Sequence, residues 1–139
     1  MIRAMKQRVK PSVELSAAIF PGAESARYTN HKFQNWRKML SEGLLDAIIP
    51  MSYEYQLASI ERGIEGVRHA IPQDSPTQLM PVLAIQRKTI DPYSGVGHPL
   101  MTKQMEIIHR MGLPGFSVFC YDWMLDSEEG LNLLRENKK

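Results

Sequence analysis

The sequence of 139 residues has little of what would mark a disulfide-bonded, membrane-bound or secreted chain. It has one cysteine, Cys120, so no intramolecular disulfide can form. No stretch approaches the roughly 18 consecutive apolar residues that a membrane-spanning helix needs. The basic start at residues 1–10 leads into Pro11 and polar residues rather than into the apolar core of a signal peptide. We therefore expect no disulfide, no membrane span and no export signal in these residues.

An excess of charge of one sign is also lacking. The 17 Lys and Arg residues against 15 Asp and Glu residues give a net charge of +2, and the basic residues are scattered. This pattern lacks the basic patch that nucleic-acid-binding proteins use. The four histidines show no paired metal-ligand spacing, and no GxGxxG follows the first apolar run. We therefore expect no nucleic-acid partner, no metal and no cofactor.

The sequence does contain a regular series of four apolar, β-rich runs. They cover residues 13–20, 46–53, 80–86 and 115–121, so their starts are 33, 34 and 35 residues apart. Such a step accommodates one strand, one helix and two loops. Helical periodicity fills the intervening segments, at residues 30–42, 57–71, 101–111 and 126–136. Gly43 and Gly112 suit the ends of the first and third of these helices, and Pro72 stops the second.

Strands that alternate with helices predict an α/β fold with parallel strands joined by right-handed crossovers. A complete (β/α)8 barrel needs about 250 residues, so four units in 139 residues match half of one. The first and fourth runs carry a mixed face opposite an apolar one, whereas central strands of an open sheet are apolar on both faces. We therefore predict a single partial domain, residues 1–139, folded as a parallel (β/α)4 half-barrel.

Functional residues are expected where the strands end, because parallel α/β folds bind ligands at the carboxyl ends of their strands. Side chains suited to the faces and hydroxyls of sugar rings lie there, namely Phe20, Tyr53, Gln86, Tyr121 and Trp123. We predict that these five residues form a carbohydrate-binding rim. The alternative is that the aromatic side chains only plug the mouth of a barrel.

Two carboxylates also follow strand ends, Glu54 and Asp122. They are the candidate catalytic pair, because glycoside hydrolysis uses two carboxyl groups as acid and base or nucleophile. Asp122 could equally stabilise its own turn. The longest connection, residues 87–99, is expected to be a loop over the barrel mouth, and its Lys, Ser and Gly residues could also bind an anion.

Several segments together resemble a known family. A helix with Trp36 leads through Gly43–Asp46 into a strand that ends in Pro50 and Tyr53, within NWRKMLSEGLLDAIIPMSYEY. With the flanking segments VELSAAIFP, LMPVLAIQ and GLPGFSVFCYDWM, this order resembles the second half of bacterial glycosyl-hydrolase-like barrels. These are described as family-ten-like glycoside hydrolases, and the resemblance covers about residues 8–125.

The resemblance implies that this chain supplies strands five to eight of a TIM-type barrel, with polysaccharide as the substrate class and the five rim residues lining the cleft. It implies full-length relatives that are exported or belong to the cell envelope. The Asp-rich end of strand four, the family's expected catalytic centre, would precede residue 1, which leaves catalysis by this chain alone open. A half-barrel also leaves its inner face uncovered, so we expect either a homodimer or a missing N-terminal half-barrel to close it.

Two rival functions fit the same residues. One is a non-catalytic module that binds a glycan or a protein through the rim, and the absence of carboxylates facing a common cleft would favour it. The other is an open-sheet enzyme that binds a phosphorylated metabolite through residues 87–99. Backbone amides holding an anion in that loop would favour this second rival.

Overall fold

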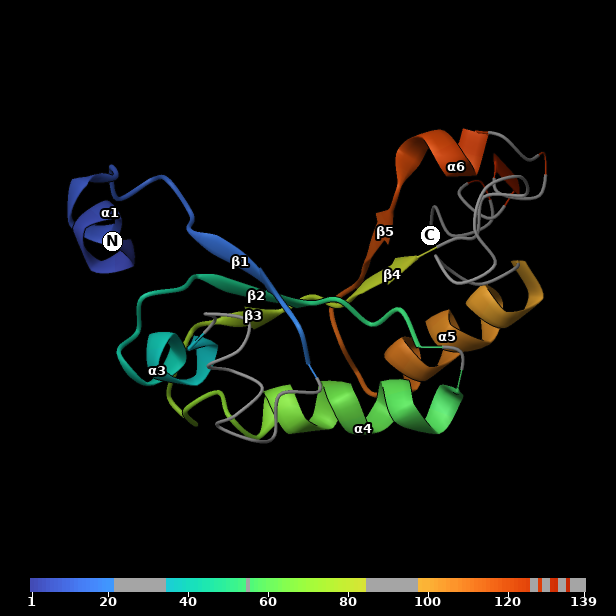
Figure 1. The fold of residues 1–139 in the computed structure, drawn as a ribbon, viewed down its shortest axis with the longest axis horizontal. Helices are drawn as coiled ribbons and strands as arrows, with labels where there is room; N and C mark the ends of the chain where they lie inside the picture. The colour runs from blue at the N-terminus through green and yellow to red at the C-terminus, as the bar shows by residue number, and fades with distance from the viewer. Residues whose placement is uncertain are drawn as a thin grey trace.

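The computed structural model of the chain alternates helices and strands along a curved arrangement (Figure 1). It describes residues 1–21, 35–54, 56–84 and 98–125, together with 128, 131, 132 and 135. The elements are α1 (Ile2–Arg8), β1 (Ser16–Ile19), α3 (Trp36–Ser41), β2 (Ala47–Pro50), α4 (Leu57–Arg68), β3 (Gln78–Leu79), β4 (Val82–Ala84), α5 (His98–Arg110), β5 (Ser117–Phe119) and α6 (Tyr121–Leu125).

Each pair of described strands is parallel. β1 pairs with β2 and β2 with β3, while β4 pairs with β5. The two small sheets are joined by a bridge between Met51 and Val82, where the Ser52 N–H donates to the Val82 carbonyl at 2.9 Å. The strands therefore follow one another in chain order across the molecule. The prediction of an α/β fold with parallel strands is confirmed.

Two prolines explain why the third predicted strand is divided into β3 and β4. The Met80 N–H donates to the Ile48 carbonyl at 3.0 Å. In a regular parallel pair, the Met80 carbonyl would next accept a hydrogen bond from the N–H of residue 50. Pro50 has no N–H, so this bond is missing. Pro81 lacks the donor on the side of β5, where its carbonyl accepts from the Ser117 N–H at 2.8 Å. β3 and β4 are thus separated because Pro50 and Pro81 lack the N–H groups that would continue the hydrogen bonding.

The main core lies between the strands and the helices α3, α4 and α5, and α4 and α5 lie side by side beneath the strands (Figure 1). In α4 the buried residues Ile60, Ile64 and Val67 recur at the helical period, as their spacing in the sequence predicts. The buried core residues are Ile19, Trp36, Leu40, Leu45, Ile48, Ile60, Ile64, Val67, Leu79, Leu83, Met101, Met105, Ile108 and Met124.

Glycines end two of the helices as the sequence predicts. Gly43 follows α3 with a φ of 63°, and Gly112 follows α5 with a φ of 67°. Beyond each glycine the next N–H bonds back into the helix, from Leu44 to the Met39 carbonyl at 3.0 Å and from Leu113 to that of Ile108 at 3.3 Å. These bonds satisfy carbonyls that the helix leaves without an internal donor, and only glycine adopts this left-handed conformation without strain.

Several predicted boundaries shift. The third run was predicted to start at residue 80, but pairing begins at Gln78, because the N–H of this polar residue donates to the Asp46 carbonyl at 2.9 Å. The fourth run was predicted to extend to residue 121, whereas β5 ends at Phe119 and Tyr121 begins α6, whose first turn holds Asp122. A carboxylate is favourable near a helix N-terminus. Residues 30–34, 85–97 and most of the predicted tail helix, 126–136, lie outside the described residues.

The helix α1 is attached by polar contacts to the segment between α3 and β2. The Arg3 Nε donates to Glu42 Oε2 at 2.7 Å, and Lys6 forms an ion pair with Asp46. Asp46 Oδ2 also accepts the Leu15 N–H at 2.8 Å, which ties the starts of β1 and β2 together. The bonds from Lys6 and from this backbone N–H favour the ionised carboxylate and hold the pKa of Asp46 below its usual value. No residue of α1 is buried, so these contacts define its position.

Replacing Asp46 by alanine should lower the free energy of unfolding by about 1 to 2 kcal/mol at neutral pH. The pKa of Asp46 is lower in the folded than in the unfolded state, so its contribution is present above the unfolded pKa of about 3.9. It is lost as pH falls through the folded value. Urea unfolding of Asp46→Ala and wild type at pH 7 and at about pH 2.5 measures this pH dependence. Equal destabilisation at both pH values would contradict it.

The matched control is Asp74→Ala, which removes an exposed carboxylate from the loop before β3. This variant should change the free energy of unfolding by less than about 0.5 kcal/mol at either pH. A comparable loss in both variants would show that net charge, rather than the contacts of Asp46, determines the effect.

Candidate functional site

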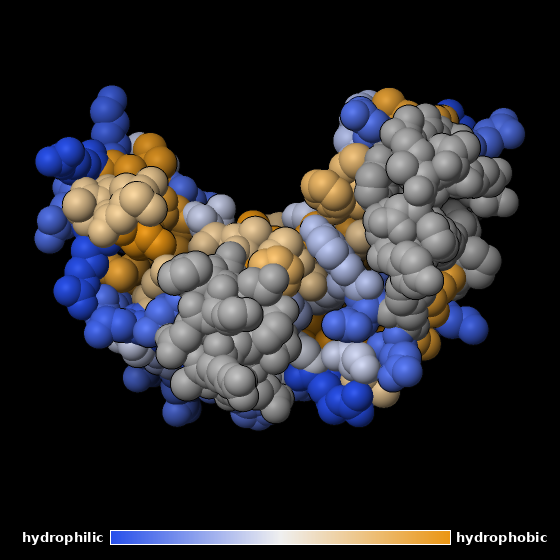
Figure 2. Space-filling view, viewed as in Figure 1, coloured by the Kyte–Doolittle hydropathy of each residue, from blue (hydrophilic) through white to orange (hydrophobic). Residues whose placement is uncertain are grey.

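The side of the strands that faces away from α4 and α5 forms a concave surface. Figure 2 shows the hollow between the end of the molecule that holds α1 and the end that holds α6, with apolar residues on its floor. Ile49 and Met80 are half-buried, and the Ser117 hydroxyl contacts the Met80 sulfur at 3.4 Å. Neighbouring strands therefore send side chains to this same side. Among the described helices, α4 and α5 cover the opposite face of these parallel strands. Parallel sheets are normally buried on both faces.

At the carboxyl end of the concave surface two aromatic rings meet. The centroids of Tyr53 and Phe119 are 6.1 Å apart and the ring planes are inclined by 30°. Met51 pairs with Val82. Two residues further along, Tyr53 is therefore level with Ala84, whose strand partner is Phe119. The small side chain of Ala84 leaves room for the two rings to approach across its strand. We call Tyr53 and Phe119 the aromatic pair.

Burial raises the pKa of the Tyr53 phenol above its usual value. The ring is half-buried, with Phe119 against it. Phe119→Ala should admit water to Tyr53 and lower its pKa towards the ordinary value of about 10. Nuclear magnetic resonance (NMR) of the Tyr53 ring carbons during a pH titration measures this. The control is Tyr121→Phe, at a side chain that is 66% exposed, which should leave the Tyr53 pKa unchanged. An unchanged pKa in Phe119→Ala would show that Phe119 does not exclude water from Tyr53.

The predicted substrate-binding residues are spread along the carboxyl ends of the strands. Phe20 directly follows β1 and is half-buried. Tyr53 belongs to the aromatic pair, and Tyr121 begins α6 with its side chain exposed. Gln86 lies outside the described residues, and of Trp123 only the backbone, within α6, is described. These positions stay candidates, and Tyr53 has a ring contact that the sequence did not predict.

The two candidate carboxylates lie at the same end of the strands. Glu54 is exposed in the turn that follows β2, and its backbone carbonyl accepts a hydrogen bond from Gln104 on α5 at 2.9 Å. Asp122 is exposed in the first turn of α6. Each carboxylate therefore follows a member of the aromatic pair closely in the chain, one residue after Tyr53 and three after Phe119.

Phe119 is the residue of this site that the sequence analysis left out. It is 49% exposed although it is a large apolar side chain. The alternation of the fourth run contains the signal, because Ser117 and Phe119 stand on the same face of the strand. The predicted rim took the last residue of the fourth run, Tyr121, as the end of the strand. β5 in fact ends at Phe119.

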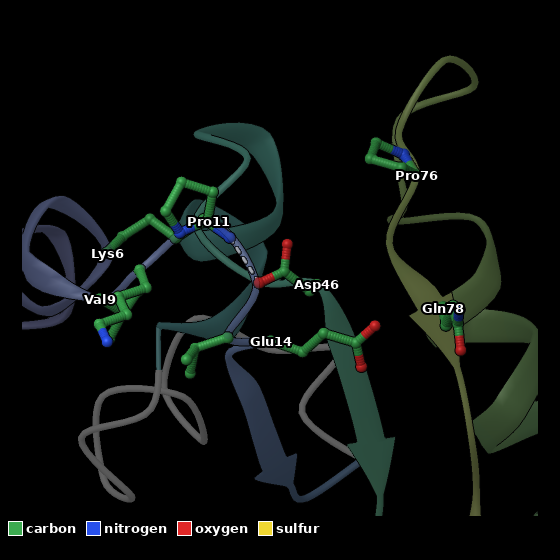
Figure 3. Close-up of a pocket in the computed structure, with 9 residues that line it drawn as sticks. Lys6, Val9, Pro11, Glu14, Asp46, Pro76 and Gln78 are labelled. Atoms are coloured by element: carbon green, nitrogen blue, oxygen red, sulfur yellow. Dashed lines mark hydrogen bonds and ion pairs between the residues drawn. The ribbon is translucent and has the colours of Figure 1, made fainter.

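A cavity of about 440 Å³ lies at the opposite, amino end of the strands (Figure 3). Glu14 and Asp46 precede β1 and β2, and Gln78 begins β3. The cavity is lined by Lys6, Val9, Lys10, Pro11, Val13, Glu14, Asp46, Pro76 and Gln78. Parallel α/β folds bind their ligands at the carboxyl ends of the strands, which is the end opposite to this cavity. We therefore do not assign the cavity as the functional site.

Within the described ranges, no group of three or more His, Cys, Asp or Glu side chains is arranged to hold a metal ion. None of the helices in that part of the chain is long and apolar enough to cross a membrane. The described contacts on the concave surface are those of the aromatic pair and of the Ser117 hydroxyl with the Met80 sulfur.

No protein-family model and no curated protein sequence matches the chain. Its fold, an α/β arrangement of parallel strands, is similar to that of bee venom hyaluronidase, solved in complex with a hyaluronic acid tetramer. The match covers 97% of this chain and 46% of that chain, with a TM-score of 0.56 and 10% identity. The chain thus spans about half the length of the hyaluronidase, a TIM-barrel glycosidase of glycoside hydrolase family 56. At this identity the likeness concerns the fold alone.

Proposed function

We propose that the chain is half of a glycosidase-type (β/α)8 barrel and binds carbohydrate at the carboxyl ends of its strands. The observation that carries this proposal is the aromatic pair, which is partly open to solvent on the concave surface. Aromatic faces suit the apolar faces of sugar rings. The fold match supports the same ligand class, because the hyaluronidase was solved with a hyaluronic acid tetramer. The proposal does not extend to a family-ten-like or bacterial origin, for which the comparisons offer no support.

Phe20, Gln86, Tyr121 and Trp123 are proposed to extend the platform that the aromatic pair begins. The exposure of Tyr121 supports its part, because a ring that is 66% exposed is free to stack on a ligand. Glu54 and Asp122 are proposed as the acid and the base or nucleophile of glycoside hydrolysis. Their exposure at the carboxyl ends of the strands, close in the chain to Tyr53 and Phe119, supports this role.

We further propose that the chain supplies strands five to eight and that a complementary half-barrel of β/α units covers the concave surface. Parallel sheets normally bury both faces, and this face is half-exposed. The match leaves more than half of the hyaluronidase chain without a counterpart in these residues. Light scattering over a concentration series should give a monomer. A compact dimer would show instead that a second copy of the chain closes the barrel.

The second candidate function is a non-catalytic module that binds glycans at the same place. Both carboxylates are exposed, whereas the acid of a glycosidase lies in an apolar, desolvated environment. This observation favours binding without hydrolysis by the chain in isolation. An open-sheet enzyme that binds a phosphorylated metabolite through residues 87–99 has no described observation in its favour, since residues 87–97 lie outside the described part.

Calorimetry with a hyaluronan tetrasaccharide, and with cellotetraose as an uncharged comparison, tests the proposed ligand class. Glu54→Gln and Asp122→Asn should keep binding and each lower any hydrolysis about 100-fold or more. Wild type that binds neither sugar would contradict the proposal. Binding without hydrolysis by wild type would assign the non-catalytic function, and full hydrolysis by both variants would remove these carboxylates from the mechanism.

A further inference from the structure

One polar side chain lies on the apolar face by which α5 packs into the core. Gln104 is fully buried, next along the helix to Met101, Met105 and Ile108, which are all buried core residues. Its amide Nε2 donates to the Glu54 backbone carbonyl at 2.9 Å, a contact between residues 50 positions apart in the chain. No described residue provides a hydrogen bond to its Oε1 atom. The side chain therefore has one of its hydrogen-bonding groups satisfied and another buried without a described partner.

Packing alone does not account for a glutamine at this position. Burying an amide group without full hydrogen bonding destabilises the folded state, and methionine, of similar shape, would fill the same space without that cost. The described polar contact of Gln104 is made to the turn that follows β2. This turn leaves the sheet after Ser52, whose N–H donates to the Val82 carbonyl, and enters α4 at Leu57. The bond to Glu54 fastens it between those two points.

We propose that Gln104 is a positioning residue that fixes the turn at Tyr53 and Glu54 from the core side of α5. The amide holds the Glu54 backbone, so the Tyr53 ring stays against Phe119 and the Glu54 carboxylate stays at the carboxyl end of the strands. The inference rests on the proposed function in one respect, namely that the fixed turn serves glycan binding. The effect on the turn itself is independent of any ligand.

The test compares Gln104→Met with wild type in the full chain. Methionine keeps the volume and removes the donor, so the Ser52 amide, which bonds to the Val82 carbonyl where the turn leaves the sheet, should exchange hydrogen about tenfold faster or more. The pKa of Tyr53 should also fall towards its ordinary value, because the released ring is hydrated. Gln104→Asn is the second variant. It keeps the amide chemistry but is one methylene too short to reach the Glu54 carbonyl, and it should release the turn in the same way.

Met105→Leu is the matched control, because it changes a buried side chain on the same helix without removing a hydrogen bond. It should leave the exchange of the Ser52 amide and the Tyr53 pKa unchanged, even if it lowers the free energy of unfolding. A merely structural Gln104 would behave like this control. Wild-type exchange and pKa in a folded Gln104→Met or Gln104→Asn protein would overturn the proposal.

Binding of the hyaluronan tetrasaccharide separates this inference from the proposed function. If the turn is released in Gln104→Met and wild type binds no glycan, the positioning role stands and the proposed ligand is wrong. If wild type binds the tetrasaccharide and the variant keeps the turn fixed, the ligand stands and the positioning role is wrong. The joint account predicts both a released turn and a Kd about threefold or more above that of wild type.

Discussion

Replacing both Tyr53 and Phe119 by alanine should weaken binding of a hyaluronan tetrasaccharide about tenfold or more. The two rings form the described aromatic surface at the carboxyl end of the strands, with their centroids 6.1 Å apart. Aromatic contacts contribute about 0.5 to 1.5 kcal/mol each beyond the area that they bury. Loss of both therefore costs about 1 to 3 kcal/mol in addition to the buried area, and roughly 1.4 kcal/mol corresponds to a tenfold change in Kd. Calorimetric titration of the double variant and wild type measures the difference.

The matched control removes two exposed apolar side chains from the other end of the molecule, in Met5→Ala/Val13→Ala. These side chains are 45% and 48% exposed, close to the exposure of Phe119. The control should bind the tetrasaccharide like wild type. Equal weakening in the two double variants would contradict an aromatic site, because it would show that any exposed apolar side chain contributes. Circular dichroism spectra of both variants should match wild type.

Replacing Trp36 by alanine should lower the free energy of unfolding by about 3 to 5 kcal/mol. Trp36 begins α3 and is 1% exposed in the core. The Arg37 guanidinium lies 4.6 Å from the centre of its ring, which adds a cation–π contact that alanine also removes. Natural domains are stable by only about 5 to 15 kcal/mol, so this loss should populate the unfolded state at low denaturant. Urea unfolding followed by circular dichroism measures it.

Trp36→Phe is the control that keeps an aromatic ring in the core. No described atom accepts the buried indole N–H of Trp36, so removing that donor leaves no described partner unsatisfied. We expect Trp36→Phe to lower the free energy of unfolding by less than about half as much as Trp36→Ala. Equal losses in the two variants would contradict this expectation, because they would show that the ring volume that phenylalanine keeps does not stabilise this site.

The elements that the sequence predicts well are those with local signals. The burial of Ile60, Ile64 and Val67 follows from their spacing along one helix. Gly43 and Gly112 end α3 and α5, because the left-handed conformation is a property of the residue itself. The repeating strand–helix step likewise reflects the length of a single β/α unit.

The features that the sequence did not predict depend on which strands are neighbours and in which register. The break at Pro50 and Pro81 requires knowing which carbonyl each missing N–H would have met. The aromatic pair forms because the register places Ala84 between Tyr53 and Phe119. The bond from Gln104 to Glu54 joins residues 50 positions apart. No local pattern encodes such contacts, so the site could be predicted only as a set of strand ends.

The most direct test of the carbohydrate site is an NMR titration of the chain with a hyaluronan tetrasaccharide, observing the aromatic and backbone resonances. A carbohydrate site at the carboxyl ends of the strands should give saturable shifts at Tyr53, Phe119 and Tyr121. The sugar is an anion, so shifts confined to Lys6 and Lys10 in the amino-end cavity would indicate simple charge attraction and would contradict the account. An absence of shifts at saturating sugar would contradict it equally.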